Sequence, residues 1–409
     1  MIPWLQTVRE LGSLGFTLTS EYKRTVRLSW NDVQEKLRKV AITWSARILP
    51  TLRQRVEVVH TFLTSLVWYK AQVLPIPKGI AKEMDSIINK FVWTGSIESI
   101  PLSLCKQERK KGGLSLVDVR MKGRALLIKN TLNLLGQENE LLKYWLQISL
   151  RNICPWLKSG LRAESMTEHY KNLTDYIKTE FEGQKLTKEE AMGFKAKNIY
   201  KEMEQEYPVP RAQTRMELDE EKWKIIWKRI ENKVHDMDAQ DILYRTIHQI
   251  IPTRYRIHRI GRAPFPFCPD CTIKKGPVEG PLLERGRRGD LDLVVGGPIG
   301  DIVHVLAECK TVEILWSWFR KLVLRQMDKS WGKMSNKEII FLIFPKFKNE
   351  ETVLWMISTY IYYIYIEVFR RRRKPRLEQL IATFELKHLA HVSSKRVALK
   401  SVDFKEGLS

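Results

Sequence analysis

The sequence predicts a mainly α-helical protein, and three observations lead to this fold class. Apolar residues recur at spacings of three and four along several segments, which is the period of a helix with one buried face. Few segments alternate apolar and polar residues as half-buried strands do, and no series of β-α-β units follows along the chain. With 409 residues, of which 44% are hydrophobic, the chain can bury the cores of two or three domains.

Residues 1–160 are expected to form a first helical region. Pro50 precedes one predicted helix, and Pro75 and Pro77 separate it from the next. Within RVEVVHTFLTSLVWYKA, four apolar side chains fall on one helical face: Val56, Val59, Leu63 and Leu66. Stripes of this kind are typical of a helix packed on a core rather than of a ligand-binding surface.

Three further regions are expected after the first. Residues 161–222 are polar and dense in lysine and glutamate, which predicts solvated helices acting as a spacer, interrupted at Pro208 and Pro210. Residues 223–330 resume the helical period and are expected to form a third helical region. Residues 331–409 predict a C-terminal helical region with a basic helix. The apolar stripe of the third region consists of Trp223, Trp227, Ile230 and Val234.

The apolar stretch from Val353 to Phe369 admits two interpretations, a buried helix or a membrane span. Seventeen residues is the short limit for a span. Glu367 and four tyrosine hydroxyls would lack hydrogen-bond partners in hydrocarbon. We therefore expect a buried or amphipathic helix and no membrane partner.

Charge and cysteine content indicate the kind of partner and compartment. The chain carries 70 basic and 47 acidic residues, a formal net charge of +23, which favours a polyanionic partner, either nucleic acid or an anionic membrane, over a merely soluble surface. Five cysteines in a long chain fit a reducing, intracellular compartment better than a disulfide scaffold. The N-terminus shows no secretory signal pattern. We expect an intracellular location, nuclear or cytoplasmic.

The usual catalytic motifs are missing from the sequence. It contains no Asp-Asp pair, phosphate-binding loop, Gly-x-Ser-x-Gly elbow or His-Glu-x-x-His pair. The carboxylates of residues 219–221 are more typical of a solvated helix face than of an acid–base pair. The prediction is therefore a non-enzymatic protein without a small-molecule substrate.

Three basic stretches are candidates for nucleic-acid contact. Residues 107–113 place four charges around a turn, for which a solvated turn is the simpler interpretation. Residues 248–262 interleave four arginines with Tyr255 and His258, a mixture that can bind phosphates and stack on exposed bases. Residues 370–376, RRRRKPR, are the densest stretch, yet such runs also serve as import signals or solvated tails.

Two short motifs together resemble the ligands of a metal site. Cys268 and Cys271 form a Cys-x-x-Cys pair, and His304 and Cys309 follow after 32 intervening residues. Three thiolates and one imidazole make a tetrahedral zinc set, but spacing alone leaves four unrelated residues as an equal alternative. Much of the gap, residues 274–300, holds seven glycines and three prolines, which predicts a loop. Because closure entropy grows slowly with loop length, the gap does not forbid a site.

The order of motifs resembles the C-terminal part of the reverse-transcriptase polyprotein of LINE-type non-LTR retrotransposons. The first block, residues 14–78, has a Leu-Gly, two Trp, a Leu-x-x-Arg-x-x-Val step and a Leu-Pro-x-Pro end. INKFVWTG and LCKQERKKGGLSLVDVRMKGRALLIK are similar to the segments that follow in the family. YRTIHQIIPTRYRIHRIGR, CPDC and DIVHVLAEC resemble its zinc-binding region, with Ile251 in place of the usual Leu and Asp301 at the acidic position.

This resemblance implies a helical thumb and a CCHC zinc knuckle that bind RNA and DNA with little sequence preference. In a full polyprotein these parts would bind template RNA and target DNA during target-primed reverse transcription, as part of a nuclear or cytoplasmic ribonucleoprotein. The implied zinc ligands are Cys268, Cys271, His304 and Cys309, with a structural role. The candidate nucleic-acid contacts are Arg53, Arg55, Lys106, Arg109, Lys110, Lys111, Arg254, Tyr255, Arg256, Arg259 and Arg262.

The chain departs from the family pattern in two ways. The two halves of the zinc motif are usually much closer together than they are here. The chain also starts after the polymerase palm, so that the catalytic aspartates and the endonuclease would lie upstream; the expectation is a non-catalytic fragment. Three alternatives stay open. They are a structural or protein-interaction role for the Trp-rich helices, a translated retroelement fragment without a selected role, and, as the weakest, a peripheral membrane protein that uses residues 353–376.

Overall fold

The computed structural model describes residues 10–47, 49, 51–94, 99–135, 150, 153–155, 174–175, 177–179, 181–202, 208–275, 293–327, 329–393 and 399–405. These residues are mainly helical, and the predicted fold class is confirmed. The chain divides into two compact units. The N-terminal unit comprises Met1–Gly95 and Ser115–Pro208, and the C-terminal unit comprises Ser96–Leu114 and Val209–Ser409. The predicted regions 223–330 and 331–409 thus belong to one unit.

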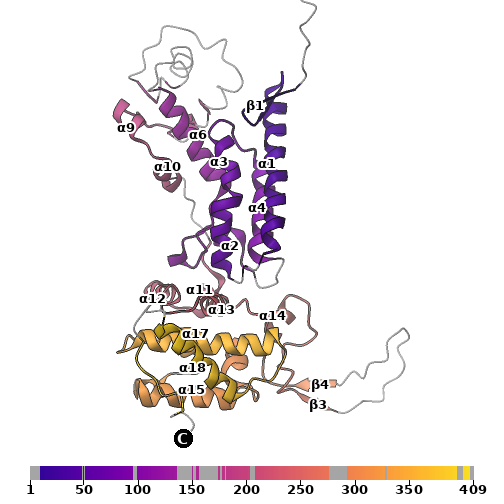
Figure 1. Ribbon diagram of the computed structural model, residues 1–409, viewed down its shortest axis with the longest axis vertical. Coiled ribbons are helices and arrows are strands. Elements are labelled where there is room, and N and C mark those ends of the chain that lie inside the picture. Colours follow the sequence, from indigo (N-terminus) through magenta and orange to yellow (C-terminus); the bar gives the residue numbers. More distant parts are fainter. Residues whose placement is uncertain are drawn as a thin grey trace, which may run out of the picture. The chain divides into compact units, whose positions relative to one another are not determined.

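The N-terminal unit is a helical bundle preceded by a short hairpin (Figure 1). The hairpin consists of β1 (Leu11–Ser13) and β2 (Phe16–Leu18), which pair antiparallel. Its helices in chain order are α1 (Tyr22–Ser45), α2 (Leu52–Val58), the π-helical η1 (Val59–Leu63), α3 (Ser65–Ala71), α4 (Lys78–Trp93), α6 (Val119–Leu135), α9 (Lys188–Gly193) and α10 (Ala196–Glu202).

Buried polar contacts fix α1 in this bundle. The indole of Trp30 is fully buried, and its N–H donates to the carbonyl of Pro75 at 2.9 Å. The buried ammonium of Lys70 lies 2.9 Å from both the Asp32 carboxylate and the Ser29 carbonyl. A buried ammonium needs such partners, because an unpaired charge in the interior is costly. The predicted stripe is core: Val56, Val59 and Leu63 are fully buried and Leu66 is half-buried.

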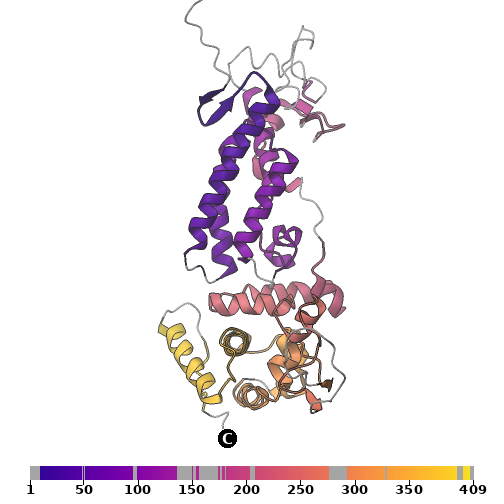
Figure 2. The ribbon, with the colours of Figure 1, turned by 90° about the vertical axis from the view of Figure 1, so that its right-hand side faces the viewer.

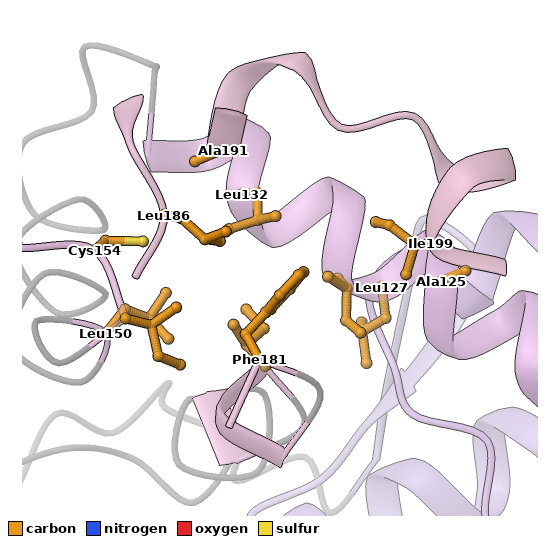
Figure 3. Close-up of a cluster of buried hydrophobic side chains, with 12 residues drawn as sticks. Ala125, Leu127, Leu132, Leu150, Cys154, Phe181, Leu186, Ala191 and Ile199 are labelled. Atoms are coloured by element: carbon orange, nitrogen blue, oxygen red, sulfur yellow. The ribbon is translucent and has the colours of Figure 1, made fainter. Parts of the chain in front are cut away.

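A second cluster of buried apolar side chains covers α6 (Figure 3). Leu127 and Leu132 of α6 meet Phe181, Leu186 and Ile199, all of them almost fully buried. This finding differs from the expectation of a solvated spacer. The apolar residues of this region are scattered among many polar ones, so that their burial becomes evident only from the packing. Residues 161–173 of the predicted spacer lie outside the described residues.

The C-terminal unit contains helices from both of its chain segments. From the first segment come α5 (Leu102–Lys106) and the 3-10 turn η2 (Arg109–Lys111). From the second come α11 (Arg211–Met216), α12 (Glu220–Ile230), α13 (Met237–Ile247), α14 (Arg254–Arg259), β3 (Ile273–Lys275), β4 (Leu293–Gly296), η4 (His304–Glu308), α15 (Glu313–Gln326), η5 (Lys329–Lys333), α16 (Asn336–Ile340), α17 (Glu350–Ile364), η6 (Tyr365–Arg370) and α18 (Leu377–Ser393).

Helix α17 is the central helix of this unit, and twelve of its residues are buried. The helix running from Glu350 to Arg370 is long and apolar enough to cross a membrane, but 78% of its apolar window is buried inside the protein. Two of its tyrosine hydroxyls donate to protein carbonyls, Tyr360 to Leu306 and Tyr363 to Arg376, both at 2.9 Å. Glu367 is buried and pairs with Arg371 at 2.6 Å.

The neighbours of α17 approach it in two directions. Helix α15 runs beside it, and the rings of Trp316 and Phe319 pack on Tyr360. Helices α12 and α13 cross it, as the two views show (Figures 1 and 2). The buried guanidinium of Arg229 joins α12 to this core, because it pairs with Glu350 at 2.7 Å and donates to the carbonyls of Leu342 and Phe344.

The turn at residues 107–113 was expected to be solvated, but its glycines are buried in the C-terminal unit. The carbonyl of Gly112 accepts hydrogen bonds from the Tyr244 hydroxyl at 3.0 Å and from the His248 imidazole at 2.9 Å. Gly112 has a φ of 88°, and a Cβ there would lie 2.6 Å from the ring of Trp227. Glycine is therefore required both by the backbone and by the indole.

The basic C-terminal residues are not on a helix, contrary to the sequence-based expectation. The basic residues from Arg371 to Arg376 form an irregular connection between η6 and α18. Pro375 removes a backbone donor there, and adjacent positive charges repel one another within a helical turn. Helix α18 itself packs on α17 through the buried ring of Phe384, which contacts Trp355.

His248 gives the C-terminal unit a predicted pH dependence. Burial lowers the pKa of His248 to about 4, below the value of about 6.5 of an unfolded histidine. Its contribution to stability is therefore complete above pH 6.5 and is lost as the pH falls toward 4. Between pH 7 and pH 5 this group should lower the free energy of unfolding by up to about 2 kcal/mol.

Urea unfolding of the wild-type chain and of His248→Gln at the two pH values measures this contribution. The variant should lose less stability on acidification than the wild type. The difference between the two isolates His248, because all other titrating groups are the same in both proteins. An equal loss in both would contradict the assignment.

Candidate metal centre

Four side chains from two distant segments of the C-terminal unit meet at one buried point. The sulfurs of Cys268, Cys271 and Cys309 and a ring nitrogen of His304 all lie within 4.8 Å of one another. The Cys309 sulfur is 3.6 Å from that of Cys268 and 3.7 Å from that of Cys271. All four residues are buried. The residues that the sequence singled out therefore form a cluster that could hold a metal ion.

The first pair of ligands lies on a tight turn fixed by backbone hydrogen bonds. The amide of Cys268 donates to the carbonyl of Pro298 at 3.0 Å, and the amide of Cys271 donates to the carbonyl of Cys268 at 3.3 Å. Phe267 and Ile299 form an isolated antiparallel bridge next to this turn. The turn directs both sulfurs to the same side, as a Cys-x-x-Cys pair requires for a single metal.

The second pair of ligands lies on the π-helical segment η4. Its wide turn carries the hydrogen bond from the Cys309 amide to the His304 carbonyl at 2.7 Å, so that residues five apart share a face. The Asp301 carboxylate accepts from the His304 amide at 2.9 Å and starts this helix. The Tyr360 hydroxyl of α17 donates a hydrogen bond to the carbonyl of Leu306 and thereby links η4 to α17. The spacing His-x-x-x-x-Cys is thus explained by a π turn.

The long insert between the pairs is closed at its base by a short sheet. Strands β3 and β4 are antiparallel, with Ile273 opposite Gly296 and Lys275 opposite Leu293. The ends of the predicted loop are therefore paired, which brings Thr272 back beside Gly297. Residues 276–292 lie outside the described residues. The pairing explains how the two halves of the motif meet despite their separation.

The immediate surroundings of the cluster favour a thiolate at Cys309 and leave a ring nitrogen of His304 without a partner. The hydrogen bond from the Cys268 thiol lowers the pKa of Cys309, while the same bond raises the pKa of Cys268. The Thr311 hydroxyl lies 3.2 Å from the Cys309 sulfur and can donate to a thiolate there. Nε2 of His304 is buried and has no hydrogen-bond partner among the described residues. A buried nitrogen without a partner is costly unless a cation binds it.

The distances between the sulfurs match those of a tetrahedral metal site. Metal–sulfur bonds of about 2.3 Å at the tetrahedral angle place two thiolates about 3.8 Å apart. The two measured separations, 3.6 and 3.7 Å, agree with this edge. The three thiols, their burial and the unpartnered imidazole nitrogen together fit a metal ion bound by four protein ligands.

The predicted basic contacts of the N-terminal unit have different surroundings. Arg53 is exposed at the start of α2. Arg55 is half-buried, and its guanidinium donates to the carbonyls of Leu49 and Val92 and to the hydroxyl of Thr94. These bonds tie α2 to the end of α4, so Arg55 has a structural role whatever else it binds.

The basic residues around η2 belong to the C-terminal unit. Lys106 and Arg109 are half-buried, with Arg109 4.0 Å from Glu231, whereas Lys110 and Lys111 are exposed. The structure therefore presents two of these four cations fully to solvent.

Helix α14 separates its basic residues onto two faces, each lining a cavity. Arg254 lines a cavity of about 650 Å³ next to Cys268 and Cys309. Tyr255, Arg256 and Arg259 line a different cavity of about 380 Å³. Arg262 is exposed beyond the end of the helix and lines neither of these two cavities. The basic stretch of residues 248–262, which the sequence predicts to form a single surface, therefore contributes to two separate cavities.

Several residues of these cavities were not among the predicted contacts. Arg372, Arg373 and Lys374 line the larger cavity; their run was recognised in the sequence without a signal for where it folds. Arg211 and Arg215 line the smaller one, and they come from the polar stretch assigned to the spacer. Only the packing of α11 near α14 reveals them.

We expect the chain to bind one equivalent of a divalent metal through these four ligands. Titration with cobalt(II) should give the charge-transfer and d–d bands of a tetrahedral thiolate site. Cys309→Ser should lose these bands, and Cys154→Ser, which alters a buried cysteine of the other unit, should keep them. Chelation should lower the denaturation midpoint, because metal binding and folding are linked. A wild-type spectrum without thiolate bands would remove the assignment.

No protein-family model matches this chain. A function for this chain must therefore be inferred from the Cys/His cluster and the charged residues around it.

Proposed function

We propose that this chain is a non-catalytic nucleic-acid-binding protein whose C-terminal unit is held together by a structural zinc ion. One observation carries the proposal. Arg254 of α14 and the run from Arg372 to Lys374, 118 residues further on, line the same cavity beside the metal cluster. The sequence contains both stretches as candidates for nucleic-acid contact, and the fold of the C-terminal unit brings them together.

The chemistry of this cavity suits a single strand. Four cations line it against the single carboxylate of Asp270. Phe369, Val368 and Ile257 supply apolar surface in the same wall. Guanidinium and ammonium groups bind backbone phosphates without regard to sequence, while aromatic and apolar groups stack on exposed bases. A volume of about 650 Å³ is in the range of ligand cavities and leaves room for a base.

Zinc is the proposed metal because of the ligand set. Three thiolates and one imidazole in a tetrahedral arrangement are typical of structural zinc. Four protein ligands leave no open position for a reacting water, which supports a structural role over a catalytic one. A bound zinc ion would hold the turn at Cys268 against η4. Because Cys268 and Cys309 both line the larger cavity, the ion would also fix that part of the cavity wall.

The order of motifs that resembles LINE-type reverse transcriptases supports the same proposal. In that interpretation the chain corresponds to thumb and zinc-knuckle regions that would grip template RNA and target DNA in target-primed reverse transcription. The charge of +23 agrees with such a partner.

RNA binding with a strong salt dependence is the first expected outcome. The affinity of the zinc-loaded chain for a single-stranded RNA should fall with salt, with a slope of log K against log[salt] of roughly −0.7 per phosphate contacted. Arg372→Gln combined with Arg373→Gln should flatten the slope by about one to two contacts. Arg370→Gln, in the same run but outside the cavity lining, should change it less.

Filter binding or fluorescence anisotropy over a salt series measures these slopes. An equal effect of the cavity variant and the Arg370 control would place the contact elsewhere. A slope near zero in the wild-type chain would leave the protein-interaction alternative as the better interpretation.

The second expected outcome is negative. Polymerase and nuclease chemistry requires acidic residues that hold metal ions at the reacting phosphate, and the sequence shows no such motif. The purified chain should therefore not extend a primer on a homopolymer template. Extension that co-purifies with the chain and persists after removal of contaminating polymerases would contradict the proposal.

A further inference from the structure

The second cavity of the C-terminal unit, on the opposite side of α14 from the metal cluster, is lined by an excess of positive charge. It has a volume of about 380 Å³. Five cations line it, and Asp301 is the one carboxylate in the lining. The cations come from three helices that are distant in sequence: Arg211 and Arg215 from α11, Arg256 and Arg259 from α14, and Lys337 from α16.

Most of this charge is not neutralised within the protein. Among the described residues, Arg211, Arg215 and Arg259 form no ion pair with a carboxylate within 4.0 Å; Arg215 donates only a long hydrogen bond to the side chain of Gln249, at 3.4 Å. The Asp301 carboxylate accepts the His304 amide that begins η4 and is committed to that cap. Burial first, and then the charges of Arg259 and Arg211, lower the pKa of Arg215, so these guanidinium groups repel one another. A bound anion would relieve this repulsion.

The rest of the lining indicates what the anion is attached to. The ring of Tyr255 is partly exposed at the cavity, and Arg259 lies over it with its guanidinium carbon 5.8 Å from the ring centre. Ile260, Met216 and Phe341 add apolar surface. Guanidinium groups bind pairs of phosphate oxygens, and the face of an aromatic ring stacks on a base. The clustered arginines together with the ring of Tyr255 therefore fit a doubly charged phosphate group attached to a base or sugar.

We propose that this cavity is a binding site for the phosphomonoester group of a nucleotide. The phosphate lies among Arg211, Arg215 and Arg259, and the base or sugar lies against Tyr255. The nucleotide is either free or the phosphorylated end of a strand, since both present the same dianion. This site is separate from the strand-binding cavity on the other face of α14 and does not depend on that proposal.

Isothermal titration calorimetry of the zinc-loaded full chain with AMP and with adenosine tests the site. AMP should bind with one site per chain, and adenosine should bind about tenfold more weakly or worse, because only the phosphate meets the arginines. Equal binding of AMP and adenosine, or no binding of AMP at millimolar concentration and low salt, would overturn the proposal.

Arg215→Gln combined with Arg259→Gln provides the matched variant. Both side chains are exposed enough for the fold to tolerate the change, which the cobalt spectrum and circular dichroism verify. The affinity for AMP should fall by about tenfold or more, while Arg262→Gln, an exposed arginine of the same stretch outside the cavity, should leave it unchanged. If Arg262→Gln lowered the affinity for AMP as much as the double variant does, the effect would come from net charge alone, and the proposed site would be refuted.

A third arm identifies the source of the phosphate. An oligonucleotide with a 5′-phosphate is compared with the same strand bearing a 5′-hydroxyl. Tighter binding of the phosphorylated strand, lost in the double variant, assigns the site to strand ends. Equal binding of the two strands together with binding of AMP assigns it to free nucleotides. In both cases Arg372→Gln should not change the affinity for AMP, which keeps this result independent of the other cavity.

Discussion

The convergence of three sulfurs and one imidazole nitrogen is the constraint on which the functional half of the C-terminal unit depends. It joins the turn at Cys268 to the segment η4, which begins after a long insert. Gly300 shows how tight the closure is, since a Cβ there would lie 3.1 Å from the Cβ of Arg254 and 3.3 Å from the backbone of Cys268. The buried imidazole nitrogen of His304, which has no partner among the described residues, would be costly in the absence of a cation.

The position of α14 follows from this closure. Its first turn is fixed by the side chain of Thr253, which accepts from the Arg256 amide, and by the Tyr255 amide, which donates to the carbonyl of Gly300. Helix α14 is only six residues long and would not be stable in isolation. Held against the Gly300 segment, it directs Arg254 to one cavity and Arg259 to the other. The segment that carries the Cys/His cluster thus determines which of two surfaces each of these arginines lines.

Sequence patterns predicted the helical class and the buried Trp223 stripe, and they singled out the two short motifs of the Cys/His cluster, because each rests on local spacing. They could not distinguish a metal site from four unrelated residues, since the pairing of β3 with β4 that brings Thr272 beside Gly297 is a long-range contact. The sequence patterns also indicated a single basic surface for residues 254–262. The spacing of the arginines alone does not determine on which face of a short helix each one lies. Arg211 and Arg215 were missed for a related reason: on a charged helix, a cavity-lining arginine has the same local pattern as a solvated one.

The burial of Gly112 has a consequence for how this protein is made and how it can change. Its carbonyl is the acceptor for Tyr244 and His248, which lie more than a hundred residues later in the chain. The chain therefore passes from one unit to the other three times, near residues 95, 114 and 208. A ribosome releases Gly112 long before its partners exist, so the C-terminal unit completes its core only after most of the chain has emerged. A fragment that begins at Val209 leaves two buried donors without an acceptor. Because each unit consists of two separate chain segments, a single cut in the chain cannot release either unit intact.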